Sequence, residues 1–304
     1  MTTMKNFLLC ILLCSVLFIA VFPTTPATAA TQFDLFPTYR QDNFVWNKAG
    51  LNDFPNIISE LKWENLRSQG VKGVLKHDMG KRHFLEASGG WGWIYSGANQ
   101  DSDYDGDNRT DETSRSNNTA DHGNVFDLSL ALGWKLQDKP TRRTSLLAGY
   151  AINSQNMTMT NGVQTIPPDG PFAGLNAAYK GLWRGPWLGI SHEQTLDKKW
   201  TLTTRVEYHL PTYNGEAHWN LRTDLAHPVT NNHWANGQGF VASLGIDCKA
   251  GPNWRIGAWV DYTNYLARNG TDQVNIVDGR HVQIRLNEVR WDSWSFRIKA
   301  SYLF

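Results

Sequence analysis

Carboxylate and imidazole side chains gather in two short stretches of this chain. Residues 101–106 read Asp-Ser-Asp-Tyr-Asp-Gly, and residues 214–218 read Asn-Gly-Glu-Ala-His. A carboxylate two positions from a histidine can orient the imidazole and raise its basicity, so Glu216 could help His218 to take a proton from water. Carboxylates facing such a pair could hold that water and share a proton. The chemistry that these residue types allow is hydrolysis without a covalent nucleophile.

The first stretch also fits a calcium loop. Asp101, Asp103, Asp105, Gly106 and Glu112 follow the pattern Asp-x-Asp-x-Asp-Gly-x5-Glu, in which oxygen ligands surround a hard cation and the glycine permits a sharp turn. A calcium site held by these four acids therefore competes with catalysis for the same carboxylates. Loops rich in Asp, Asn and Gly are also common as plain solvated turns.

The elements that must position these clusters read as β-strands. In the last segment, even positions are apolar and odd positions are polar or charged, so successive side chains define one apolar and one polar face. The apolar positions are Trp294, Phe296, Ile298, Ala300, Tyr302 and Phe304. The same alternation recurs at 126–136, 200–210 and 254–262. A membrane-spanning strand needs only ~9 to 11 residues with alternate positions facing lipid, which is compatible with the mean hydropathy of -0.45.

We predict an all-β fold, a closed antiparallel transmembrane β-barrel of about ten strands. The strands are expected at 32–46, 57–78, 83–98, 122–137, 142–158, 176–196, 199–213, 235–249, 253–268 and 289–304. Long connections, expected at 99–121, 159–175, 214–234 and 269–288, alternate with short turns. This alternation is typical of extracellular loops and periplasmic turns. Charged residues on the inner face, Arg205, Glu207, Arg255, Asp261, Arg297 and Lys299, are expected to form ion pairs inside a narrow lumen.

Residues 1–30 read as a cleaved secretory signal peptide, because an apolar run follows Lys5 and ends in small residues at 27–30. Residues 31–304 are then one barrel domain in the bacterial outer membrane. Positive and negative charges nearly cancel, with 29 Lys and Arg against 28 Asp and Glu, which gives no reason to expect a nucleic acid partner.

Short segments in a fixed order carry a family resemblance. They are Ser59-Glu60-Leu61-Lys62-Trp63, Ser102-Asp103-Tyr104-Asp105, Thr110-Asp111-Glu112, Asn124-Val125-Phe126-Asp127-Leu128, Leu147-Ala148-Gly149-Tyr150 and Tyr179-Lys180. Taken together they span nearly the whole chain after residue 30. The sequence resembles the omptins, which are ten-stranded outer-membrane proteases and adhesins, and more loosely the related protochlamydial outer-membrane proteins.

The resemblance implies an endopeptidase in which an Asp-x-Asp pair faces an Asp-x-His pair across the barrel mouth. Asp103 and Asp105 match the first pair, and His218 matches the histidine. Glu216 stands where the family has Asp, and Asn214 replaces an acid that helps to select basic substrates.

The sequence therefore supports two hypotheses. The first is a monomeric surface endopeptidase whose catalytic residues are Asp103, Asp105, Glu216 and His218, acting on a peptide or protein substrate. Its chemistry requires no cofactor, and the resemblance implies lipopolysaccharide as an activator and outer-membrane lipid as a partner. The second is a non-enzymatic barrel of the same fold, an adhesin or structural protein, with calcium bound to the surface segment that holds Asp101 and Glu112.

Overall fold

Antiparallel strands form nearly all of the backbone that the structure, a computed structural model, describes at residues 30–304. The predicted signal peptide lies almost wholly outside these residues. The strands are β1 (Thr31–Lys48), β2 (Ser59–Met79), β3 (His83–Gly106), β4 (Thr110–Thr119), β5 (Gly123–Lys139), β6 (Arg142–Ile166), β7 (Gly170–Pro171), β8 (Asn176–Thr195), β9 (Trp200–His209), β10 (Thr212–His218), β11 (Asn231–Lys249), β12 (Trp254–Asn275) and β13 (His281–Leu303). Two short 3-10 turns, η1 (Leu51–Asp53) and η2 (Asp107–Arg109), lie in connections.

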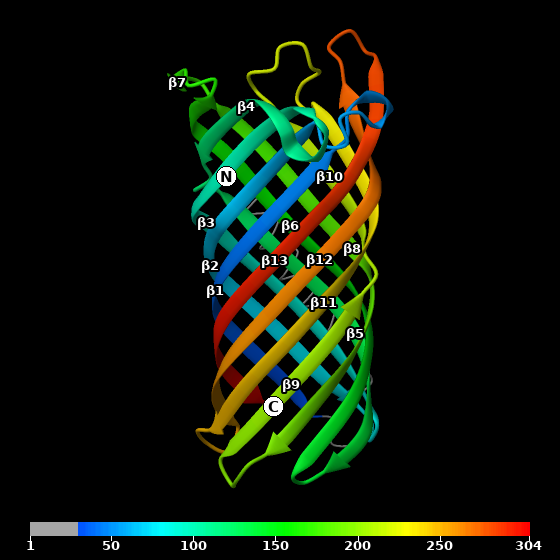
Figure 1. Ribbon diagram of the computed structural model, residues 1–304. Helices are drawn as coiled ribbons and strands as arrows, with labels where there is room; N and C mark the ends of the chain where they lie inside the picture. Colours follow the sequence, from blue (N-terminus) through cyan, green and yellow to red (C-terminus); the bar gives the residue numbers. More distant parts are fainter. Residues whose placement is uncertain (1–29) are drawn as a thin grey trace.

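The sheet closes on itself because β1 pairs with both β2 and β13. One strand position, between β3 and β6, is filled by β4 in its upper part and by β5 below it. In the same way, β9 and β10 share the strand position between β8 and β11. The wall therefore has about ten strand positions, which confirms the predicted barrel. Closure leaves no open sheet edge that would need to pair its backbone within a lipid bilayer. Figure 1 shows β4, β7 and β10 at the upper end and the C-terminus at the lower end.

Side-chain alternation on β13 follows the prediction. Phe296 and Ile298 face outward and are 55% and 59% exposed, whereas Arg297 and Lys299 face the lumen and are 8% and 4% exposed. Nearer the upper end of the same strand, the outer face is polar at Gln283 and Arg285. The apolar band thus covers the lower part of the wall, and the strands continue above it. Within residues 30–304 the structure has no helix long and apolar enough to cross a membrane.

The long connections are shorter than expected. β3 continues to Gly106 before turning into β4 at Thr110, and β12 continues to Asn275 before β13 starts at His281. Cross-strand hydrogen bonds satisfy the backbone of these polar segments above the apolar band. Both acidic and histidine clusters therefore lie on strands rather than on loops.

Candidate functional site

The acidic cluster lies at the upper end of β3, and two of its carboxylates face the barrel interior. Asp101 is opposite Leu61 and Asp103 is opposite Ser59 on β2, and Leu61 is 2% exposed in the interior core. Burial, followed by repulsion from Asp103, raises the pKa of Asp101 to about 7. Asp105, near the end of β3, is exposed. The interior face of the rim thus carries a close acidic pair, Asp101 and Asp103.

Glu216 and His218 lie on the opposite face of their strand. Tyr213 and Ala217 of β10 are 0% and 2% exposed and belong to the interior core, so the alternate positions 216 and 218 point out of the barrel. Glu216 is exposed, and the His218 Nδ1 atom lies 2.8 Å from the Pro228 carbonyl oxygen. The structure therefore does not bring these two side chains to face Asp103 and Asp105 across the mouth.

The four acids of the predicted calcium loop are also separated. A register shift between β3 and β4 places Glu112 opposite Tyr104, on the other face of the sheet from Asp101 and Asp103. There its carboxylate forms an ion pair with Arg115. Across residues 30–304, no cluster of three or more His, Cys, Asp or Glu side chains is arranged to hold a metal ion.

A buried polar chain that the sequence analysis missed crosses the upper interior. Lys48 Nζ lies 2.8 Å from the Asp272 carboxylate, and His233 Nε2 lies 3.3 Å from the same group. Tyr179 links His233 to Tyr213, with its hydroxyl 2.7 Å from His233 Nδ1 and 2.6 Å from the Tyr213 hydroxyl. Burial alone would raise the pKa of Asp272, but Lys48 and His233 outweigh burial and hold the pKa well below its usual range.

This polar chain is enclosed by aromatic rings, and His233 is 2% exposed beneath Trp46, whose ring centroid lies 4.8 Å away. A peptide substrate could contact this imidazole only if the surrounding aromatic rings moved. Lys48 continues the inward alternation of β1, which is the sequence signal that could have placed it here. Asp272 follows a bulge on β12, and a bulge reverses the face without leaving a mark in the alternation. His233 keeps the inward parity of Asp247 on β11, so this parity, extended beyond residue 235, could have placed it.

Aromatic side chains fill the upper lumen. Trp63 and Tyr179 stack with ring centroids 5.3 Å apart, and Trp183 lies 4.5 Å from Tyr213. The largest fully buried side chains of the described chain include Trp46, Trp63, Trp183, Tyr179, Tyr213 and Tyr265. Rings of this size contribute most of the apolar burial in such a core. The layer that they form, the aromatic layer, closes the lumen near its upper end.

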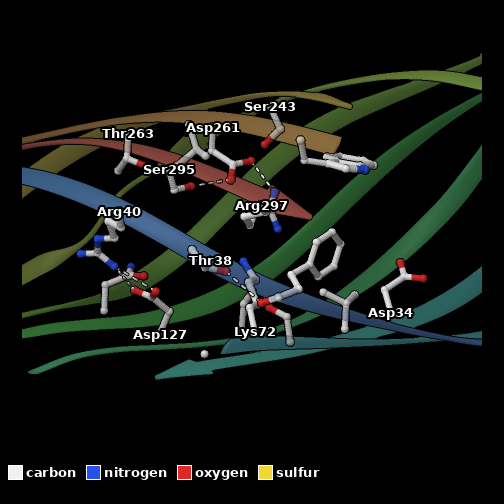
Figure 2. A pocket seen from close by; sticks show the side chains of 18 of the residues that line it. Asp34, Thr38, Arg40, Lys72, Asp127, Ser243, Asp261, Thr263, Ser295 and Arg297 are labelled. Carbon is white, nitrogen blue, oxygen red and sulfur yellow. Dashed lines mark hydrogen bonds and ion pairs between the residues drawn. The ribbon is translucent and has the colours of Figure 1, made fainter. Parts of the chain in front are cut away.

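Below the aromatic layer, charged side chains surround a chamber of about 240 Å³. Ion pairs join its walls, as predicted for the inner face: Arg205 with Glu86 and Glu207 at 2.6 and 2.5 Å, Arg297 with Asp261 at 2.5 Å, and Lys299 with Asp247 at 3.2 Å. Arg255, at the lower end, is exposed instead. Figure 2 shows two of the pairs that line the chamber, Arg297 with Asp261 and Arg40 with Asp127, and the side chain of Lys72.

Comparisons with known proteins bear on the fold and the family. The family model described as Protochlamydia outer membrane protein matches residues 35–304. The crystal structure of the outer membrane protease OmpT from Escherichia coli superposes with a TM-score of 0.72 at 14% identity, over 93% of this chain and 99% of that chain. The translocator domain of the autotransporter NalP from Neisseria meningitidis has a TM-score of 0.38 at 13% identity, over 99% and 96%. No curated protein sequence matches.

Proposed function

Because the chain belongs to the Protochlamydia outer membrane protein family, we propose that it acts at the cell surface, through contacts of its extracellular rim. It is an outer-membrane β-barrel, and its apolar outer face contacts lipid. The proposed role is adhesive or structural and does not require passage through the lumen.

The aromatic layer is the observation that carries this proposal. Trp63, Trp183 and Tyr213 are each 0% exposed, and all three lie in one interior cluster at the upper end. A solute that entered from outside would have to displace these close-packed rings, at a cost of several kcal/mol for each large side chain. The surface above the layer is then the part of the molecule available to partners.

The connections at the upper end present apolar side chains to solvent. Leu51 and Phe54, between β1 and β2, are 65% and 63% exposed, and Val277, between β12 and β13, is 65% exposed. These residues lie above the apolar band, where lipid does not cover them. Apolar side chains on an otherwise polar surface are typical of contact sites.

Endopeptidase activity is the second candidate, and one observation favours it: Asp103, from the acidic pair that the omptin resemblance implies, faces inward at the rim. We rank it second because Glu216 and His218 point out of the barrel. Calcium binding at Asp101 and Glu112 ranks lower still, since these residues lie on opposite faces of the sheet.

Two assays separate the candidates. A broad peptide library incubated with the protein and lipopolysaccharide should remain uncut, for the wild type as for Asp103→Asn and His218→Ala. Cleavage by the wild type that both variants lose would establish the endopeptidase.

Cells that display the barrel should adhere to a panel of immobilised glycans and membrane proteins. The double variant Leu51→Ser, Phe54→Ser should adhere several-fold less, whereas Leu196→Ser, at the opposite end of the barrel, should adhere as the wild type does.

A further inference from the structure

Two histidine imidazoles face each other at the upper end of the barrel. His218 ends β10, and His227 lies in the connection between β10 and β11. Their Nδ1 atoms are 3.4 Å apart, whereas their ring centroids are 5.1 Å apart and the ring planes cross at 75°. The two rings therefore meet through these nitrogens rather than by stacking. His227 is exposed and His218 is partly exposed, so ions in solution can reach the pair.

The other ring nitrogen of His227 determines where this imidazole carries its proton. Its Nε2 atom lies 3.1 Å from the backbone carbonyl oxygen of Arg222. Because a carbonyl oxygen only accepts hydrogen bonds, Nε2 carries the proton, and the neutral imidazole has a lone pair at Nδ1. Histidines that bind metal ions typically donate their other ring N–H to a backbone carbonyl or a carboxylate. The Nδ1 lone pair of His227 is thus oriented toward His218 before any ligand binds.

His218 donates its Nδ1 proton to the carbonyl oxygen of Pro228, at 2.8 Å. The 3.4 Å to His227 Nδ1 exceeds the range of about 2.7 to 3.2 Å in which an N–H donor bonds well, so the two imidazoles are not joined by a good hydrogen bond. If the proton moves to Nε2 through solvent, His218 adopts its other neutral tautomer. Two lone pairs then face each other across the gap.

We propose that His218 and His227 bind one divalent transition-metal ion, of the zinc or copper type, through their Nδ1 atoms. Zn–N bonds are about 2.0 to 2.1 Å long, so two tetrahedral ligands are separated by about 3.3 Å, close to the observed 3.4 Å. Imidazole suits Zn²⁺ and Cu²⁺, whereas Ca²⁺ prefers oxygen ligands. Within residues 30–304, no third His, Cys, Asp or Glu side chain is arranged with the pair. Water would fill the remaining positions, and the affinity would be lower than that of a four-ligand site.

The surroundings of the pair permit a cation to bind. The nearby guanidinium of Arg222 is neutralised by Asp224, to which it donates two hydrogen bonds of 2.8 and 2.6 Å. The backbone N–H of Ala226 donates to the carbonyl oxygen of Asn275 on β12, at 2.8 Å. A metal ion at the next residue would also attach this connection to the end of β10. The site would bind its ion whether or not the rim serves adhesion.

Zinc titration by isothermal calorimetry tests the site, with the barrel purified in detergent and without a polyhistidine tag. We expect saturable, equimolar binding of Zn²⁺ and no saturable binding of Ca²⁺. His218→Ala and His227→Ala should each weaken the zinc affinity by about tenfold or more, because losing a ligand costs at least as much as losing a group that orients one. His122→Ala is the matched control, since this exposed histidine contacts the Asp121 carboxylate instead of a second imidazole. It should bind zinc as the wild type does.

Pulsed electron paramagnetic resonance of bound Cu²⁺ provides a readout in the wild type alone, which does not depend on how the variants fold. The spectrum should show two coordinated imidazoles in the wild type and one in His227→Ala. The absence of saturable zinc binding, an unchanged affinity in His227→Ala, an equal loss in His122→Ala, or a single imidazole on copper in the wild type would each overturn the proposal.

Discussion

Asp101 illustrates how one side chain can make the stability of the barrel depend on pH. Burial and the neighbouring Asp103 raise its pKa to about 7, from the usual 3.8 of an aspartate. A carboxyl with a raised folded-state pKa contributes stability below its unfolded pKa, and this contribution is lost as the pH rises through the folded value. The wild type should therefore lose stability between about pH 4 and pH 7, relative to a variant without this charge.

Asp101→Asn should accordingly raise the urea midpoint at about pH 8 and leave it nearly unchanged at about pH 4, because the wild-type carboxyl is protonated at the lower pH. Asp105→Asn, at an exposed acid on the same strand, is the control. Tryptophan fluorescence at both pH values measures the midpoints. An equal gain at the two pH values would show that the charge of Asp101 is not the cause.

The outward orientation of Glu216 and His218 could have been predicted from the alternation of residues along the chain. From Trp200 to Leu210, the even positions face outward, and the same parity continues through Thr212 to His218 without a reversal. β10 continues this parity from Thr212 to His218, where a loop was predicted from residue 214. The inward orientation of Asp101 could not be predicted, because a bulge near Ser96 exchanges the two faces of β3 and no residue pattern marks it.

Among the elements, the junction between β4 and β5 depends on one glycine. Gly123 begins β5 with φ at 141°, and a Cβ atom added there would lie 2.0 Å from the backbone oxygen of Asn156. Gly123→Ala should therefore destabilise the barrel by about 1 to 3 kcal/mol, through backbone strain and displacement of β6. Gly89→Ala is a suitable control, since its added Cβ would meet nothing closer than 3.9 Å. Urea unfolding of both variants measures the difference, and equal midpoints would contradict this account.

Strand positions were predicted well because lipid outside and charge inside impose a strict alternation on the lower wall. The upper ends of the strands were not predicted well, because both faces of a strand can be polar above the membrane. On β13, Gln283 and Arg285 are solvent-exposed although they are paired in the sheet. Only cross-strand pairing, which the sequence does not reveal, distinguishes such a segment from a loop.

For the whole molecule, the level of the membrane can be tested by placing a charge on the outer wall. Ile298→Arg, in the apolar band of β13, should cost about 2 to 4 kcal/mol, because the guanidinium would face the lipid core. Gln283→Arg, on the outer face of the same strand but above the band, should cost about 0 to 1 kcal/mol. Unfolding from lipid vesicles in urea compares the two variants. Similar costs would mean that the membrane does not end between these positions.

The proposed surface role depends most directly on closure of the lumen by the aromatic layer. Conductance across a planar lipid bilayer tests this closure, with the purified barrel inserted at increasing amounts and an open porin as the positive control. Because Trp63, Trp183 and Tyr213 are completely buried in the upper lumen, we predict no stepwise current above that of the bare bilayer. Steady unitary currents from the wild-type protein would contradict closure and, with it, a function confined to the rim.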